Sequence, residues 1–279
     1  MSLAGVEPAS ADGQSALAAL VRAGGGTLTL AGAEVPVLAA WAAAARAAGF
    51  ARVWVAAGPA GLTAEALAGL AGAGLGGLRL RLYAAEAAAH DYHAGHEGSF
   101  RATLGTARAA RAARLPVTVT TPLTRSNSRV MAALPGLLAD IGALGWQVAT
   151  VAAGGSANHG AVAPRLAVAL PYALQAMVAA ERVGLLAAIA GAPLCLLGPL
   201  RDRSVATPVR AFADACSGCA LRPGCPGLDA AYLGRFGAGE LVPVTQGGGP
   251  VASGARSMKL RDMFSGPWLE LSEGPCWPI

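Results

Sequence analysis

The sequence predicts an α/β protein: a partial (β/α)6 barrel of the TIM type, followed by a cysteine-rich extension. Six short runs of apolar and β-branched residues alternate with alanine-rich segments that suit helices. The repeat of roughly 25 to 35 residues is typical of parallel strands joined by helices. All five cysteines come after the last of these runs. We therefore expect the partial barrel over residues 1–194, a cysteine-rich segment over 195–243, and a flexible linker with an apolar tail over 244–279.

The strands are expected where short apolar, β-branched runs are bounded by glycines or polar turns. The first run lies between Gly26 and Gly32 and reads TLTLA. The six expected strands are Thr27–Ala31, Arg52–Ala57, Leu78–Tyr83, Val117–Thr121, Trp146–Val151 and Leu185–Ile189.

The helices are expected between these strands, and several carry start or stop signals. Thr63 caps one helix with Glu65 in its first turn, and Gly49 ends another. Pro135 interrupts a helix or starts it afresh, and Pro171 is expected in a first turn, where proline is tolerated. After a short mobile leader over residues 1–13, the expected helices are Ser15–Ala23, Val37–Gly49, Leu62–Ala73, Ser99–Ala113, Ser128–Gly145 and Pro171–Val183.

The composition favours a protein with a sizeable core and no nucleic-acid or membrane partner. The chain of 279 residues is 54% hydrophobic and 13% charged, so it can bury a core. Its net charge of +5 comes from arginines scattered along the chain, which indicates a solvated surface. The uncharged run 183–200 contains glycines and Pro193, which suit a buried strand and loop better than a membrane span. The first ten residues show no secretory signal, so we expect a cytoplasmic protein.

The cysteines are the most informative residues of the chain. Cys195, Cys216, Cys219 and Cys225 follow the spacing C-x20-C-x2-C-x5-C. Four thiolates in a tetrahedral shell select zinc or an iron–sulfur cluster, and the single close pair favours the cluster. Disulfides and unligated core cysteines are the alternatives. Cys276, in the tail, competes with Cys195 for the fourth ligand position.

Four stretches resemble parts of the radical S-adenosylmethionine (radical SAM) enzymes. The segment LAGAEVP over residues 30–36 resembles the Gly-Gly-Glu loop after that family's second strand, which implies a cofactor contact for Gly32 and Glu34. The segment over residues 216–243 is similar to the C-terminal segments, of the SPASM or twitch type, that carry an auxiliary [4Fe–4S] cluster. By this resemblance Cys195, rather than Cys276, is the fourth ligand. The stretches over residues 83–100 and 123–127 resemble loops after the family's fourth and fifth strands.

The chain also departs from that family in ways that matter for chemistry. Radical enzymes of this family need a C-x3-C-x2-C motif after the first strand, whereas no cysteine precedes Cys195 here. The first strand itself is missing, because the leader and one helix precede Thr27. Ala33 replaces the second glycine of Gly-Gly-Glu, and Arg81 stands where a small serine often sits. The chain alone is therefore expected not to cleave S-adenosylmethionine.

These observations predict a degenerate, radical-SAM-like iron–sulfur pseudoenzyme. It would act as an accessory or substrate-binding subunit, in peptide modification, together with a catalytic radical SAM partner or a peptide substrate. One alternative is an enzyme component that becomes active when a partner chain supplies the missing cysteines. A zinc-stabilised interaction module is another.

Three further features carry weaker expectations. His90, His93 and His96 are spaced by three, which suits a metal site on a helix, although nearby glycines favour a loop with solvated or capping histidines. The glycine-rich stretch over residues 154–160 suits an anion-binding loop or a plain loop. Ser126 and Ser128 have no visible base partner, so neither is expected to be a nucleophile. The apolar tail is expected either to pack back on the open barrel or to dock a partner.

Overall fold

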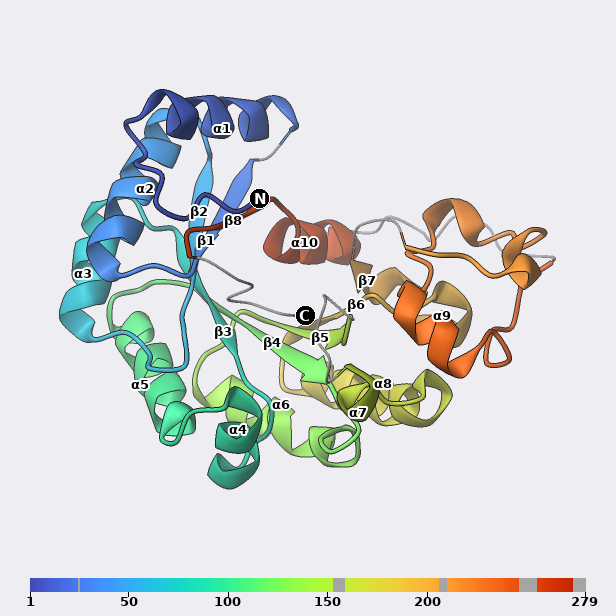
Figure 1. Ribbon diagram of the computed structural model, residues 1–279. Helices are drawn as coiled ribbons and strands as arrows, with labels where there is room; N and C mark the ends of the chain where they lie inside the picture. Colours follow the sequence, from blue (N-terminus) through green and yellow to red (C-terminus); the bar gives the residue numbers. More distant parts are fainter. Residues whose placement is uncertain (25, 153–158, 206–209, 246–254, 273–279) are drawn as a thin grey trace.

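A curled, all-parallel sheet forms the body of the protein. The computed structural model describes residues 1–24, 26–152, 159–205, 210–245 and 255–272. The sheet has eight strands in the order β7-β6-β5-β4-β3-β2-β1-β8, and every neighbouring pair is parallel. Figure 1 shows helices wrapped around the outside of this half-barrel. The predicted α/β partial barrel is confirmed. The strands are β1 Thr27–Ala31, β2 Arg52–Ala56, β3 Gly77–Arg81, β4 Val117–Leu123, β5 Gly145–Thr150, β6 Leu186–Ala190, β7 Ser204–Val205 and β8 Trp268–Glu270.

Most helices cover the outer face of the sheet, whereas α10 lies against its inner face and α9 belongs to the cysteine-rich segment. They are α1 Ala11–Arg22, α2 Val35–Ala47, α3 Ala64–Gly72, α4 Ala87–Ala94, α5 Ser99–Ala112, α6 Leu134–Asp140, α7 His159–Val162, α8 Leu166–Arg182, α9 Ala230–Phe236 and α10 Ala255–Phe264. Short 3-10 turns connect several of them. None of the helices in the described residues is long and apolar enough to cross a membrane.

Alternation along each strand divides the sheet into two faces. In β1, Leu28 and Leu30 point outward into the main core, which also holds Trp41 and Trp146 beneath the helices. Each such fully buried side chain stabilises the fold by about 1.5–3 kcal/mol relative to an exposed one. Thr29 and its equivalents on the other strands point to the inner, concave face.

One helix prediction is confirmed and another differs from the structure. The helix expected over 128–145 starts afresh near Pro135: a 3-10 turn, Ser128–Ala133, is followed by α6, which starts at Leu134 with a proline in its first turn and ends at Asp140. Helix α8 starts at Leu166, so Pro171 lies inside it and not in its first turn. The proline leaves the carbonyl of Ala167 without a helical donor, but both residues are exposed, so water can satisfy it.

The leader is held in place, contrary to the expectation that it is mobile. The Leu3 N–H donates to the Glu270 carbonyl at 2.8 Å, and the Glu270 N–H donates to the Met1 carbonyl at 2.9 Å. The first residues therefore pair with the tail strand β8.

The tail packs back on its own barrel. Strand β8 pairs in parallel with β1, placing Leu269 opposite Leu30. Helix α10 buries Leu260, Met263 and Phe264 against the inner face of β5, β6 and β7, within the open side of the curled sheet (Figure 1). Gly145 on β5 allows this approach, because a Cβ there would lie 2.6 Å from the Met263 sulfur. The tail thus covers the edge of β1 that faces away from β2.

Candidate metal centre

Within the cysteine-rich segment, residues 210–229 form a compact loop that precedes α9. Its two sides are joined by a bridge in which Ala211 and Leu228 exchange backbone hydrogen bonds at 2.9 Å. Gly227 follows at a φ of 69°, where a Cβ would lie 2.6 Å from the Ala211 carbonyl oxygen. A larger residue at Gly227 would therefore push the two sides of the loop apart.

The C-x2-C pair sits on the tight turn that its spacing predicts. The Cys219 N–H donates to the Cys216 carbonyl at 3.2 Å, which closes the turn. A second turn, in which the Cys225 N–H donates to the Arg222 carbonyl at 3.2 Å, presents the third cysteine of the segment. Cys195 comes from elsewhere, a 3-10 turn that follows β6. Two distant parts of the chain therefore supply the sulfurs.

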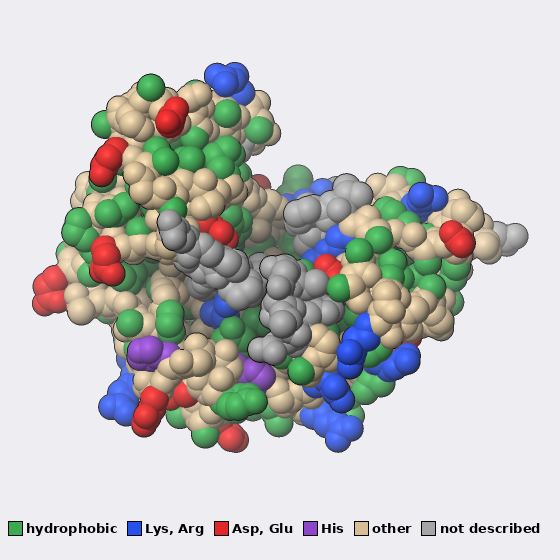
Figure 2. All heavy atoms as spheres, viewed as in Figure 1, with side chains coloured by type: hydrophobic (Ala, Val, Ile, Leu, Met, Phe, Trp, Pro, Cys, Tyr) green, Lys and Arg blue, Asp and Glu red, His purple; other side chains and the backbone are tan. Residues whose placement is uncertain are grey.

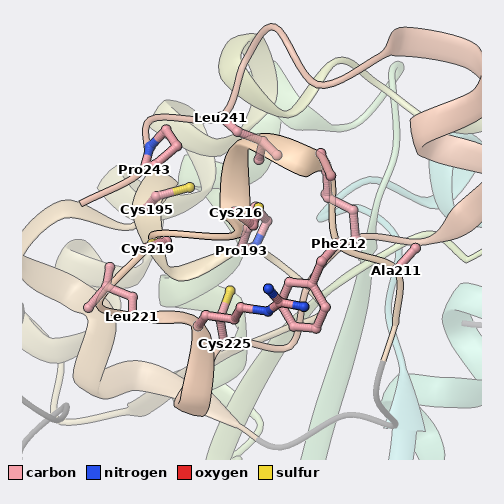
Figure 3. Close-up of a pocket in the computed structure, with 14 residues that line it drawn as sticks. Pro193, Cys195, Ala211, Phe212, Cys216, Cys219, Leu221, Cys225, Leu241 and Pro243 are labelled. Atoms are coloured by element: carbon pink, nitrogen blue, oxygen red, sulfur yellow. The ribbon is translucent and has the colours of Figure 1, made fainter. Parts of the chain in front are cut away.

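All four predicted ligands line one cavity. Cys195, Cys216, Cys219 and Cys225 surround it together with apolar side chains, and it contains about 410 Å³ of empty space, part of it open to solvent. Figure 3 shows Cys195, Cys216 and Cys225 around this space, with Leu241, Phe212 and Pro243 at its border. The four cysteines are free thiols and half-buried. The disulfide alternative therefore has no support among them.

Backbone N–H groups point at three of the four sulfurs. The Leu194 N–H donates to Cys225 Sγ and the Val244 N–H donates to Cys219 Sγ, both at 3.4 Å. The Val242 N–H makes a hydrogen bond to the Cys195 sulfur. Such donors stabilise sulfur in its negatively charged form.

The local environment disfavours an isolated thiolate at Cys195. Burial raises the pKa of its thiol, and the neighbouring Cys225, Cys219 and Cys216 raise it further, whereas the Val242 N–H lowers it. A bound metal reverses this balance, because a coordinating thiol loses its proton outright. The raised pKa of Cys195 thus makes its ionisation depend on a cation in the cavity.

Within the described residues, no group of three or more His, Cys, Asp and Glu side chains is placed to hold a metal ion. Tetrahedral zinc requires all its sulfurs about 2.3 Å from one centre. A [4Fe–4S] cluster spreads four thiolates over separate irons. The choice between zinc and a cluster stays a prediction.

An arginine lies at the mouth of this cavity. Arg222 lines both the cavity and an adjoining open groove of about 840 Å³, and its guanidinium stacks on Phe212 at 5.0 Å from the ring centre. Arg222 is exposed, so its charge faces solvent as well as the cysteines.

A polar link fixes the cysteine-rich segment to the barrel. Tyr232, on α9, accepts the Leu166 N–H at 2.7 Å and donates to Glu240 Oε2 at 2.6 Å. Glu240 also accepts from Arg165 and from the Ala167 N–H. Burial, with the hydrogen bond to Glu240, raises the pKa of Tyr232. The start of α8 is thereby tied to the segment that carries the cysteines.

The predicted cofactor residues lie elsewhere, at the carboxyl end of β1. Gly32 adopts a φ of 78°, and Glu34 is the exposed residue before α2, with no capping hydrogen bond from its side chain. Both line a wide groove between the ends of β1 and β2. Their contact with S-adenosylmethionine stays a prediction. An activating cluster would need cysteine ligands near this groove, and the chain has no cysteine before Cys195.

The three histidines do not form a metal site. His90 is buried: its Nδ1 accepts the Tyr83 N–H at 3.2 Å and its Nε2 lies 3.2 Å from Ser99 Oγ. Burial lowers its pKa to about 4. Beside it, Asp91 accepts the N–H groups of Gly98 and Phe100 at the start of α5. Asp91, and not His90, therefore caps the start of α5, and within the described residues no histidine belongs to a metal-binding group. His90 and His93 lie on helix α4 and not in the expected loop.

The expectation that Ser126 has no base partner is wrong. Its Oγ lies 2.6 Å from His93 Nε2, and Thr124 Oγ1 lies 3.2 Å from the same oxygen. The His93 ring stacks on Tyr83, and burial lowers its pKa. The two residues are 33 positions apart, His93 on α4 and Ser126 in the turn after β4, so no local sequence pattern could have paired them.

Two other candidates lie wholly or partly outside the described residues. Cys276 is one of them. The glycine-rich stretch 154–160 is the other, since 153–158 are outside the described part of the chain. Elsewhere, Figure 2 shows basic side chains at several separate places on the visible face, as the scattered arginines predict.

Comparison with known proteins finds similarity only among solved structures. No protein-family model matches the chain, and no curated protein matches it. Among solved structures, a domain of a pyruvate-formate lyase-activating enzyme from Bacteroides vulgatus superposes with a TM-score of 0.46 and 17% sequence identity. The match covers 58% of this chain and 98% of that domain. At this level it carries no conclusion about activity.

Proposed function

We propose that this chain is a radical-SAM-like iron–sulfur protein without radical chemistry of its own, which holds an auxiliary [4Fe–4S] cluster through Cys195, Cys216, Cys219 and Cys225. The observation that carries the proposal is the single cavity that all four cysteines line. The N–H groups directed at three of the sulfurs support it, because a bound cluster leaves its thiolates negatively charged.

The cluster, when bound, would supply electron transfer, because four thiolate ligands leave no iron with an open coordination position. The chain's own residues would hold it and set its surroundings. Two turns fix the close cysteines, and the 3-10 turn after β6 fixes Cys195. Pro193, Leu221 and Leu241 line the cavity and exclude water, while Arg222 offers positive charge at its mouth. Burial and N–H donors of this kind tune the potential of iron–sulfur centres.

The barrel supports a non-catalytic role for the chain alone. Helix α10 fills part of the concave face and β8 occupies the free edge of β1. A partner that supplied the missing strand would have to displace β8 from that edge. The alternative in which a partner chain completes an activating site is therefore less favoured.

The proposed role is that of an accessory or substrate-binding subunit for a catalytic radical SAM partner, in peptide modification. The open groove lined by Phe212, Ser217 and Arg222 beside the cysteines supports this role, because it gives a partner or peptide access to the edge of the cluster site.

Anaerobic reconstitution of matched variants tests the proposal. Wild-type protein and Cys276→Ser should bind iron and inorganic sulfide and show the broad visible absorption of a cluster. Cys195→Ser and Cys216→Ser should bind less iron or form an unstable cluster. Stoichiometric zinc without iron, or loss of the cluster from Cys276→Ser but not from Cys195→Ser, would contradict the ligand set.

A further inference from the structure

The inner face of the barrel has an apolar half and a polar half. Helix α10 covers the small and apolar residues of β5, β6 and β7. The inward positions of β1 to β4 are different, because the strand alternation places there Thr29, Trp54, Arg79, Arg81, Thr118 and Thr120.

Arg79 is the most unusual of these residues. It is 2% exposed and its Nε donates to Thr29 Oγ1 at 2.9 Å. Its guanidinium lies between two indole rings, 5.4 Å from the centre of Trp54 and 5.6 Å from that of Trp268. Gly77 makes room for Trp54, because a Cβ there would lie 2.5 Å from the indole ring. Both indole rings are within cation–π distance of the guanidinium, whose N–H groups still need hydrogen-bond acceptors.

Two buried donors at this place have no acceptor. Arg79 Nη2 and Trp54 Nε1 are both buried, and neither has a hydrogen-bond partner in the described structure. Nη2 lies on the same edge of the guanidinium as Nε. No ion pair to Arg79 is found among the described residues, although Glu270 on β8 faces the same side of the sheet. Burying a charge without a counter-charge costs several kcal/mol, and each orphaned donor adds about 1–3 kcal/mol.

Deprotonation does not remove this cost. Burial lowers the pKa of Arg79 to about 10, so the guanidinium stays charged at neutral pH. Cation–π contacts with the two indoles offset part of the cost of removing the guanidinium from water. They leave the donors on the guanidinium edge unmet.

We propose that the inner face of the barrel binds an anionic ligand, a carboxylate or phosphate group, whose oxygens accept from Arg79 Nη2 and Trp54 Nε1. A planar guanidinium edge matches both groups, and oxygen acceptors satisfy both donors at once. This site uses different residues from the cysteine cavity and does not depend on the cluster.

The surroundings give the ligand a route and a second positive charge. Arg81 lies two residues further along β3, on the same face, toward the carboxyl end where barrel folds bind their ligands. Arg81 and Trp268 are only half-buried, so these two side chains lie between Arg79 and solvent. Next to them, Thr120 and Gln147 add polar groups to the same wall.

Anion binding to the full-length protein tests the proposal. Inorganic phosphate and acetate are the two probes, each added at constant ionic strength with chloride as the balancing anion. Equilibrium dialysis with labelled phosphate should give about one site per chain, and a phosphate series should raise the melting temperature by about 2 °C or more. Whichever probe has the greater effect identifies the source of the anion.

Three variants separate this site from general salt effects. Arg79→Met should lose the anion-dependent rise, and should melt no lower than wild type without anion, because an unpaired buried charge has been removed. Arg79→Lys should keep the charge but bind the probes several-fold more weakly. Arg101→Met, at an exposed position on α5, should behave like wild type.

The proposal would be overturned if the anions raised the melting temperatures of wild type and Arg79→Met equally. It would also be overturned if the wild type showed no saturable binding of either anion. A lower melting temperature of Arg79→Met in chloride, with no anion effect on wild type, would make Arg79 a structural spacer between the two indoles. Dialysis of the wild type decides the matter even where a variant does not fold.

Discussion

At the scale of single residues, the buried histidine of α4 explains how the connection between β3 and α5 is fixed. His90 accepts the Tyr83 N–H and contacts Ser99 Oγ, so it joins the end of the strand to the start of α5. The ring must be neutral to accept at Nδ1. Protonation and the fold of this connection are therefore linked.

The free energy of unfolding should fall as the pH drops from 6.5 to 4. Burial lowers the pKa of His90 from 6.5 to about 4, so between these values the unfolded chain binds the proton more readily. The stabilisation is complete above pH 6.5 and decreases by up to about 3 kcal/mol as the pH reaches 4. Urea titrations of the wild type and His90→Asn across this range measure it. The exposed His96→Asn is the control, and an equal pH slope in His90→Asn and wild type would contradict the prediction.

The hydroxyl group of Tyr232 should contribute to the free energy of unfolding in addition to the packing of its ring. In Tyr232→Phe, the Leu166 N–H and Glu240 both lose a buried partner, which should cost about 1–3 kcal/mol. Thermal or urea unfolding measures the loss, and the exposed Tyr172→Phe should change little. If the two variants had equal stability, the link between α8 and α9 would not contribute in solution.

At the scale of elements, the junction of β6 with the cysteine-rich segment depends on a glycine. Gly191 follows β6 at a φ of 77°, and a Cβ there would lie 2.3 Å from Thr150 Oγ1 and 2.7 Å from Arg210 Nη2. The Arg210 guanidinium donates to the Gly191 carbonyl and to Thr150 Oγ1. This glycine thus allows Arg210 to reach the end of the sheet.

Gly191→Ala should destabilise the protein by about 1–3 kcal/mol, because it combines a left-handed backbone with a steric clash. Gly105→Ala, in the exposed face of α5 with open space around it, should instead stabilise by about 0.5–1 kcal/mol. Denaturant unfolding of both variants measures these opposite signs. A neutral Gly191→Ala would show that the junction relaxes freely.

The tail strand is the second element with a clear test. Leu269 on β8 is fully buried in the main core, so Leu269→Ala should cost about 2–5 kcal/mol. Leu144→Ala, at an exposed position, provides the comparison. Urea unfolding gives both values. Equal stabilities would mean that β8 does not stay paired with β1 in solution.

The barrel strands were predictable because each is a five- to seven-residue apolar run with its own turn signals. Strands β7 and β8 were not, since they hold two and three residues and are strands only through their neighbours. The position of Pro171 was mispredicted because tertiary packing extends α8 beyond its local start signal. The tight turn of Cys216 and Cys219 was predicted from their spacing. The contact of His93 with Ser126 depends instead on the packing of α4 beside the turn after β4, and it has no local signal.

At the scale of the whole molecule, the chain has two regions, the barrel and the cysteine-rich segment. The barrel closes its own free edge with β8 and half fills its concave face with α10. The cysteine-rich segment lies beyond the carboxyl end of β6 and takes one of its four sulfurs from the turn that follows this strand. The proposed metal site therefore lies outside the barrel, whose own interior is partly filled by α10.

The most direct test of this account is the iron and inorganic sulfide content of the chain purified without air. The account predicts about four irons and four sulfides per chain, held by Cys195, Cys216, Cys219 and Cys225. A chain that contains one zinc, or no metal after reconstitution with iron and sulfide, would contradict it.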